Sequence, residues 1–294
     1  MRIIDTFMYF DEDLVLDIRL NTLNNFIHKF LICESKFSHN GQPKKLNFDI
    51  NNFQKFKDKI EYIVLDHQPN HLLKINSNDS DKVKKNKILD NALLRENYQR
   101  NFCLNYLKKF SEEDLVLIND LDEIPNLKDF KYNYKITIFK QKMFYYKLNL
   151  EFPNFTWMGS KICKIKNLIS PQWLRNVKSK KYPYWRIDAF FDKKKYFNIG
   201  FIESGGWHFT NIMSPEKIDF KMRSFLHHLE YEESGYNIQK LKELIKSKKV
   251  MYDHNADKKN QGKWQSEKNL RRIGLEQLPE YIQKNFSTLN TWID

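Results

Sequence analysis

Apolar runs and helix-like segments alternate along the first 120 residues of the chain. Short apolar runs bounded by polar residues predict buried strands at residues 2–8, 29–34, 62–65 and 115–118. Apolar side chains at helical spacing predict a helix capped by Asp11; they are Leu16, Leu20, Leu23 and Ile27. Strands that alternate with helices are typical of an α/β fold, here a Rossmann-like mixed sheet flanked by helices.

The remaining segments are expected to complete this sheet and its helices. Helices are predicted at about 51–58 and 87–109, with a polar loop over 66–86 between the third strand and the second of these helices. Strand-like runs follow at 135–140, 142–149 and 161–166. Ser214 and Pro215 begin a helix that should reach about 229, as N-cap and first helical residue. Two further helices are expected at about 237–248 and 276–286.

Composition and charge narrow the class of protein. A chain of 294 residues with 41% hydrophobic and 15% aromatic residues can bury a substantial core. Its three cysteines are too few for a disulfide framework. No run of 18 apolar residues or signal-like leader is found, so we expect a soluble, cytoplasmic protein with at most peripheral membrane contact. The net charge of +13 suits nucleic acid, an anionic membrane, anionic small substrates or simply solvated lysines.

Two aspartates follow the apolar run at 115–118. Ligands of open α/β sheets bind outside the carboxyl ends of the strands, where Asp120 and Asp122 are expected. Because residues two apart in an extended segment point to one side, both carboxylates can face one hard divalent cation. That cation would bridge the phosphates of a nucleotide sugar. The alternative is an exposed acidic turn, but Pro125 makes a stiff exit that favours a defined site.

Three separated segments carry a family resemblance: NDLDEIP at residues 119–125, CESKFSHNGQPKKL at residues 33–46 and GWHF at residues 206–209. The first is similar to the D-x-D-E-I-P signature of glycosyltransferase family 17. The segment CESKFSHNGQPKKL at residues 33–46 resembles its E-S-x-F/T-x-x-G-x-P-K/R-x-L segment. The segment GWHF at residues 206–209, followed by Lys221, resembles its G-W-H block. The similarity extends from about residue 2 to the C-terminus.

The resemblance implies a single GT-A-type catalytic domain over residues 1–294. Residues up to about 125 would form the nucleotide-sugar-binding half, and residues from about 126 the acceptor half with the C-terminal helices. The implied reaction is inverting transfer of N-acetylglucosamine from UDP-GlcNAc to a glycan hydroxyl, with Mn²⁺ or Mg²⁺. The expected partners are this donor and an oligosaccharide or glycolipid acceptor, and no nucleic acid is expected.

Further residues are candidates for the metal and the nucleotide. The resemblance implies that a late histidine, His208, completes the metal site, whereas a core histidine is the alternative and His254 the reserve. Glu34 and Ser35 end a strand on the same rim and could contact the base or ribose. The arginines that precede the metal-binding strand could bind the diphosphate, or could be solvated helix residues; they are Arg95 and Arg100. Asp120 could contact the ribose or a metal-bound water instead of the metal.

Inverting transfer also needs a carboxylate that accepts the proton of the acceptor hydroxyl. Glu203 and Asp188 are equal candidates for this catalytic base, and Asp192 is the next. Aromatic side chains near them could stack on acceptor sugars or belong to the core; they are Trp173, Tyr182, Tyr184 and Trp185.

A second hypothesis is that the chain has the same fold without catalysis. Its basic charge would then serve to bind nucleic acid or an anionic glycan. The presence of both Asp120 and Asp122 favours the hypothesis that the chain is an enzyme. The sequence contains no P-loop, dinucleotide-binding or nucleophile-elbow motif that would support another enzyme class.

Overall fold

The computed structural model describes residues 1–183, 185–256, 261–264, 266 and 268–294. In these residues ten strands form one mixed sheet in the order β3-β2-β1-β4-β7-β6-β9-β5, with β8 paired to β6 and β10 to β7. The strands are β1 (Ile3–Tyr9), β2 (Lys29–Ser35), β3 (Ile60–Leu65), β4 (Leu115–Ile118), β5 (Glu123–Pro125), β6 (Ile136–Tyr145), β7 (Leu150–Lys164), β8 (Ile199–Ile202), β9 (Gly206–Thr210) and β10 (Arg271–Arg272). The predicted α/β fold with a mixed sheet is confirmed.

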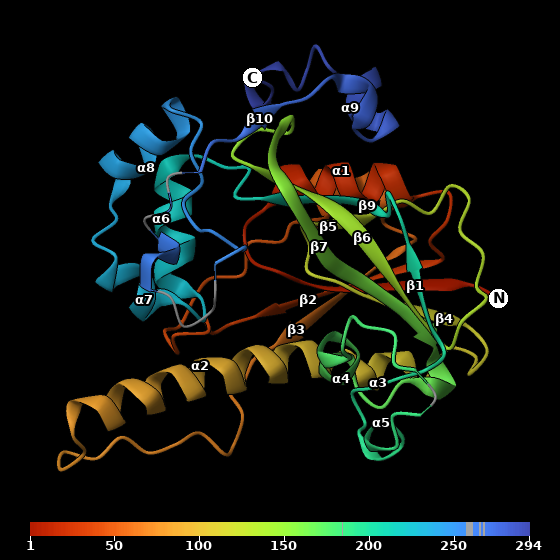
Figure 1. Cartoon of the computed structure of the whole chain (residues 1–294), viewed down its shortest axis with the longest axis horizontal. Coiled ribbons are helices and arrows are strands. Elements are labelled where there is room, and N and C mark those ends of the chain that lie inside the picture. The colour runs from red at the N-terminus through yellow and green to blue at the C-terminus, as the bar shows by residue number, and fades with distance from the viewer. Residues whose placement is uncertain (184, 257–260, 265, 267) are drawn as a thin grey trace.

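Helices flank this sheet (Figure 1). The helices are α1 (Asp13–Leu23), α2 (Asp81–Phe102), α3 (Leu104–Leu107), α4 (Pro171–Asn176), α5 (Asp188–Phe191), α6 (Pro215–Ser224), α7 (His228–Glu233), α8 (Ile238–Lys246) and α9 (Glu280–Lys284). Within the described residues, no helix combines the length and the apolar character needed to cross a bilayer.

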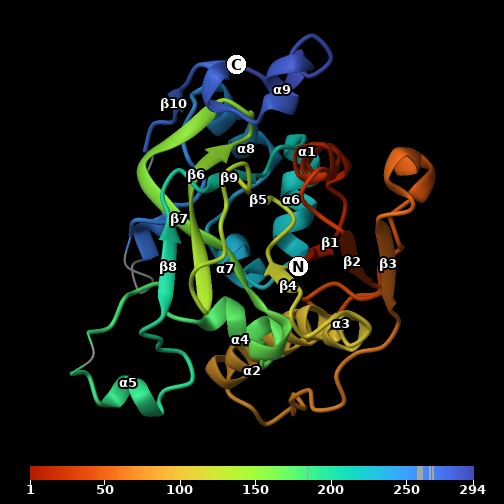
Figure 2. The ribbon, with the colours of Figure 1, turned by 90° about the vertical axis from the view of Figure 1, so that its right-hand side faces the viewer.

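Alternate residues of the strands pack into two separate hydrophobic cores. Leu115 and Leu117 of β4 point into a core shared with α1, whereas Val116 and Ile118 point into a core shared with α3 and α4. This two-residue alternation is the normal result of strand geometry. Figures 1 and 2 show α1 on one side of the parallel strands and α2, α3 and α4 on the other. Burial on both faces explains why these strands are apolar runs.

A third core lies where the sheet meets the C-terminal helices. Met143 and Tyr145 of β6 pack there with Ile218 of α6 and with Leu241 and Leu244 of α8. The helices expected at 214–229 and 237–248 thus bury apolar side chains in this core.

Several boundaries differ from those expected. Helix α1 begins at Asp13 after Glu12, and Asp11 does not cap it. Helix α2 begins at Asp81 after its N-cap Ser80, earlier than predicted, because its first turns project into solvent and carry no apolar stripe (Figure 1). Helix α6 ends at Ser224, where Phe225 becomes extended and packs its ring against Phe10 at 4.9 Å.

Strands β6 and β7 are longer than the three runs predicted from the sequence. The expected break near residue 141 is absent, because Gln141 is buried and its side-chain amide donates to Ser160 Oγ at 3.0 Å. A 3₁₀ segment, Ile50–Phe56, takes the place of the helix expected at 51–58.

A buried ion pair connects the first strand and helix to the segment after β4. Arg19 Nη2 of α1 donates to Asp5 Oδ1 of β1 at 2.6 Å, and both side chains are 0% exposed. Arg19 Nη1 also donates to the carbonyl oxygens of Leu121 and Glu123. Asn119 donates its amide to Asp5 at 2.6 Å. The pair therefore holds the backbone of residues 119–123, called the acidic segment below, at the edge of the sheet.

We predict that Arg19→Met lowers the free energy of unfolding by about 3–5 kcal/mol, because it leaves Asp5 as an uncompensated buried charge. The midpoint of urea unfolding measures the loss. Lys85→Met is the matched control, since it breaks an ion pair with Glu233 that is 58% exposed on both sides. An unchanged midpoint for Arg19→Met would show that the pair carries no stability.

Candidate functional site

The acidic segment lies between strand β4 and strand β9. Strand β5 pairs antiparallel with β9, so that Glu123 lies opposite His208. The backbone N–H of Phe209 donates to the carbonyl oxygen of Asp122 at 2.9 Å. Gly206 makes the close approach possible, since its φ is +131° and an added Cβ would lie 2.1 Å from the Ile124 carbonyl oxygen. The NDLDEIP and GWHF segments, distant in sequence, are therefore neighbours.

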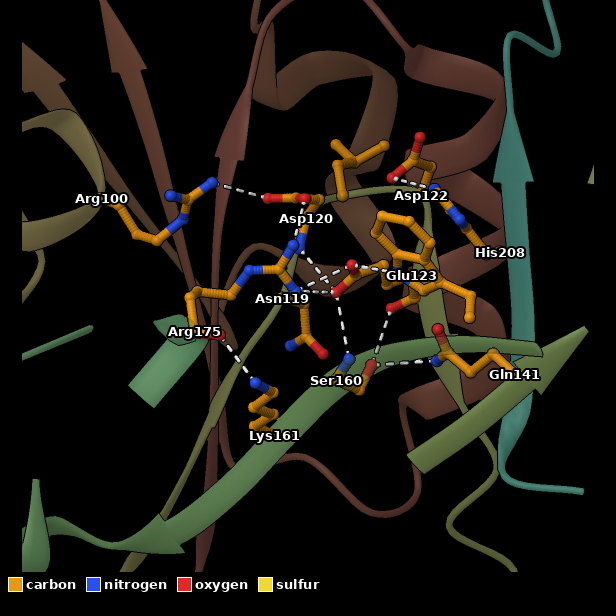
Figure 3. A network of polar contacts seen from close by, with 12 residues as sticks. Arg100, Asn119, Asp120, Asp122, Glu123, Gln141, Ser160, Lys161, Arg175 and His208 are labelled. Atoms are coloured by element: carbon orange, nitrogen blue, oxygen red, sulfur yellow. Dashed lines mark hydrogen bonds and ion pairs between the residues drawn. The ribbon is translucent and has the colours of Figure 1, made fainter. Parts of the chain in front are cut away.

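Glu123 is the buried anchor of this segment. Its carboxylate accepts hydrogen bonds from Trp157 Nε1 at 2.6 Å and from Arg175 Nη1 at 2.8 Å. It also accepts hydrogen bonds of 3.1 Å from the backbone N–H groups of Asp120 and Ser160. A buried carboxylate with four donors is satisfied. Glu123 therefore shapes the loop and has no free acceptor for a substrate (Figure 3).

Asp120 lies between two arginines. Arg100 of α2 donates to Asp120 Oδ1 at 2.9 Å, and Arg175 of α4 donates to Asp120 Oδ2 at 2.7 Å. Burial alone would raise the pKa of Asp120, but Arg175 and Arg100 outweigh burial and lower that pKa below its ordinary value. The Asp120 carboxylate is thus ionised and held in one orientation.

Asp122 faces the opposite side, toward His208 (Figure 3). Its Oδ1 lies 3.3 Å from His208 Nε2, and the Asp122 side chain is 15% exposed. Burial would raise the pKa of Asp122 and lower that of His208, but their mutual attraction reverses both directions. The His208 ring packs against Trp157 at 4.7 Å, and its Nδ1 is buried without a hydrogen-bond partner among the described residues.

A lysine from α6 completes the charges around the two aspartates. Lys221 Nζ lies 2.9 Å from Glu12 Oε1, and both side chains are nearly buried. Burial would lower the pKa of Lys221, whereas Glu12 and then Asp122 raise it above its ordinary value. Lys221 therefore carries its charge close to Asp122.

A pair of side chains is available to a divalent cation. Within the described residues, no group of three or more His, Cys, Asp and Glu side chains is arranged around a common point. Asp122 and His208 are adjacent side chains of types that bind metals. Both carboxylate oxygens of Asp120 instead accept hydrogen bonds from arginines. Such a pair leaves most coordination positions of a cation to substrate and water.

Three of the other predicted nucleotide contacts have local partners. Glu34 is 0% exposed and accepts from Lys44, from Tyr62 Oη at 2.8 Å and from the backbone N–H groups at 47 and 48. Ser35 Oγ accepts the Phe37 N–H at 3.0 Å. Arg95 donates to Gln68 and to the His39 carbonyl oxygen, not to Asp120. The geometry gives these residues a role in shaping the loop at 36–48, and their contact with a nucleotide stays a prediction.

The ring of Trp157 contacts both His208 and His254, the reserve metal ligand. The ring of His254 is 5.6 Å from Trp157 and 4.7 Å from Tyr252. Burial, with a smaller contribution from His208, lowers the pKa of His254 to about 3. The sequence suggested a polar tail around His254, whereas its ring lies among aromatic side chains; its role as a metal ligand stays a prediction.

The structure does not bring the predicted catalytic bases to Asp122. Glu203 lies before β9, beyond the end where Gly206 pairs with Pro125, and it is 74% exposed beside Lys140. Asp188 lies in α5, which stands apart from β5 and β9 in Figures 1 and 2. Arg186 and Lys195 pair with it, and they lower its pKa. The third candidate, Asp192, pairs with Lys195.

The predicted aromatic platform does not form a continuous surface. Trp173 is 9% exposed, lies in the core with α4 and donates to the Lys193 carbonyl oxygen at 2.6 Å. Tyr182 packs its ring under Lys195, and Trp185 is 80% exposed. Tyr184 lies outside the described residues. For Trp173, the structure agrees with the alternative that its side chain belongs to the core.

A cavity of about 450 Å³ adjoins Asp120 on its basic side. Helix α2, strand β7, helix α4 and the segment to residue 179 line it, and its walls include Glu96, Arg100, Trp157, Lys161 and Arg175. Lys161 donates to the carbonyl oxygens of Arg175 and Val177 at 2.7 and 2.6 Å and so caps α4. Burial lowers the pKa of Lys161 to about 7.

Sequence reasoning missed Arg175, Lys161 and the anchoring role of Glu123. The N-cap Ser170 with Pro171 marks the start of α4, and this signal could have placed Arg175 on a short helix. Nothing local in the sequence indicates that this helix packs beside the end of β4.

Comparison with known proteins shows the family of the chain. The profile of glycosyltransferase family 17 matches residues 1–253. The beta-1,4-mannosyl-glycoprotein 4-beta-N-acetylglucosaminyltransferases of Rattus norvegicus and Homo sapiens are each 23% identical to this chain over 232 residues. The aligned region covers 71% of the chain but only 40% of each relative, so the chain spans well under half the length of the curated relatives it matches. The chain belongs to glycosyltransferase family 17.

Proposed function

We propose that this chain transfers N-acetylglucosamine from UDP-GlcNAc to a hydroxyl group of a glycan, with inversion and with a divalent cation. The observation that carries the proposal is the placement of Asp122 beside His208 at the carboxyl end of β4, next to an ionised Asp120. Membership of family 17 and the names of the mammalian relatives support the sugar and the reaction type.

A GT-A architecture is part of the proposal. The parallel strands β3, β2, β1 and β4 would form the nucleotide-binding half, and the antiparallel β7 would begin the acceptor half. The acidic pair lies where these two parts of one sheet meet, at the carboxyl edge that binds ligands in open α/β sheets.

Asp122 and His208 would hold the cation. Hard cations such as Mg²⁺ and Mn²⁺ commonly take one or two protein carboxylates and complete their shell with substrate phosphates and water, so the Asp122 carboxylate fits this role. His208 would add a nitrogen ligand only as the neutral imidazole, so binding of the cation would release its proton. The bound cation would supply Lewis-acid stabilisation of the departing diphosphate.

The cationic side chains of the protein would act around the diphosphate. Arg100 and Arg175 keep Asp120 ionised and fixed, and Lys221 adds a positive charge near Asp122. Fixed charges of this kind stabilise a developing anion without reorganisation during the reaction. The cavity beside Asp120 falls within the ~300–1,000 Å³ typical of ligand pockets, and Trp157 gives it an aromatic wall that suits a sugar ring.

The first prediction concerns the metal site. Asp122→Asn removes a charge without changing side-chain volume, and we expect turnover of UDP-GlcNAc to fall by at least ~10²-fold while the thermal midpoint in the absence of ligand is retained. Asp129→Asn, at an exposed position, is the control. Wild-type turnover by Asp122→Asn at saturating Mn²⁺ would exclude Asp122 as a ligand.

The second prediction concerns the donor. A ligand that binds only the folded state stabilises it by about 2.7 kcal/mol at 100 times its Kd, which raises the melting temperature. We expect UDP-GlcNAc to raise it with Mn²⁺ present and to have a much weaker effect in EDTA. Stabilisation by a GDP- or CMP-sugar, with none by UDP-sugars, would contradict the assignment.

The third prediction concerns the proposed bases. Because neither carboxylate adjoins Asp122, we expect Glu203→Gln and Asp188→Asn each to leave transfer within a few-fold of the wild-type rate. Rates of transfer and of donor hydrolysis should be measured for each variant. A ~10²–10⁴-fold loss of transfer, with unchanged donor binding, would instead identify that residue as the base.

A further inference from the structure

Residues 178–183 and 185–195 form a projection below α4 that includes α5 (Figures 1 and 2). Three large apolar side chains on it are exposed to solvent: Trp185 is 80% exposed, Ile187 71% and Phe191 84%. Elsewhere in the described part of the chain, no large apolar side chain other than that of Met1 is more than 57% exposed. Clustered exposure of this kind marks an interaction site more often than a neutral surface.

The same projection is strongly basic. Residues 178–195 contain seven Lys and Arg residues against two Asp residues, which gives a net charge of +5. Both aspartates are already paired within the projection, by Arg186 and Lys195. No carboxylate of the described residues lies within ion-pair distance of the other exposed lysines, which are Lys178, Lys180, Lys181, Lys193 and Lys194.

The projection is tied to the body of the protein at its base. The backbone N–H of Lys178 donates to the Lys194 carbonyl oxygen at 2.8 Å. The indole of Trp173 donates to the Lys193 carbonyl oxygen at 2.6 Å, and its ring packs against Tyr196 at 5.7 Å. These bonds hold the two ends together, so the apolar side chains are presented outward on a closed loop.

We propose that residues 178–195 dock the protein on the surface of an anionic lipid bilayer. Tryptophan prefers the membrane interface, phenylalanine and isoleucine can enter the boundary with the acyl chains, and lysines are attracted to anionic headgroups. A membrane suits the shape better than nucleic acid does, because single strands bind along basic grooves, whereas this feature is a projection.

Docking would also place the candidate site near the bilayer. The cavity beside Asp120 is lined by Arg175, Lys178 and Ser179, so the projection begins at the cavity wall. Under the proposed function, an acceptor carried on a lipid would then reach the cavity from the membrane. The docking itself does not depend on that function.

Co-sedimentation with vesicles, in the absence of substrates, tests the proposal. We expect the full chain to bind phosphatidylcholine vesicles that contain phosphatidylglycerol at least tenfold more tightly than vesicles of phosphatidylcholine alone, and less tightly as salt rises. Each lysine near an anionic surface contributes roughly fivefold, so Lys193→Gln with Lys194→Gln should weaken binding about 25-fold. Trp185→Ala with Phe191→Ala should weaken it at least tenfold.

Matched controls separate docking from general charge and from activity. Lys57→Gln with Lys82→Gln removes two exposed lysines outside the projection, and Phe286→Ala removes a ring that is 45% exposed; both variants should bind vesicles as the wild type does. All variants should keep the wild-type thermal shift with UDP-GlcNAc. Failure of wild-type binding, or wild-type binding by the Trp185 and Phe191 variant, would overturn the proposal. Binding to an RNA oligonucleotide that anionic vesicles do not displace would also overturn it.

Discussion

The buried pair of Asp5 and Arg19 is the constraint on which the site depends. Its charges lie out of water, so each requires the other, and Arg19 uses its remaining donors on carbonyl oxygens of the acidic segment. Strand β1 and helix α1 thereby determine where the chain runs after β4. The segment that carries Asp120 and Asp122 is thus positioned by residues more than a hundred positions earlier in the sequence.

Alternating charges continue from this scaffold into the site. Glu96, Arg100, Asp120, Arg175 and Glu123 form an unbroken series of acidic and basic side chains. Every oxygen of Asp120 and Glu123 is used within that series, so both residues serve first to shape the loop. Asp122 stands outside the series, so the two aspartates of one motif have different surroundings.

The sequence predicted those parts of the fold that depend on local pattern. Strand β4 was predicted at its observed limits, because four consecutive apolar residues have no alternative but burial on both faces. The neighbourhood of Asp122 and His208 followed only from the family resemblance, since an antiparallel contact between β5 and β9 leaves no local signal. Arg175 was missed because its ion-pair partners, Asp120 and Glu123, lie about fifty residues earlier in the sequence, and no local pattern links them to α4.

The placement of Glu203 shows the same limit. Glu203 comes just before the GWHF segment in the sequence, but an extended strand carries the chain away from Asp122 within a few residues. Periodicity predicts which residues face the core, and it does not predict which ends of two strands meet.

The central claim is that Asp122 and His208 bind a cation and Asp120 does not. Anomalous diffraction from a crystal grown with Mn²⁺ and UDP measures this directly. The account predicts a manganese peak within coordination distance of an Asp122 carboxylate oxygen and of His208 Nε2, with Asp120 still bonded to Arg100 and Arg175. A peak coordinated by Asp120, with the arginines displaced and His208 free, would contradict it.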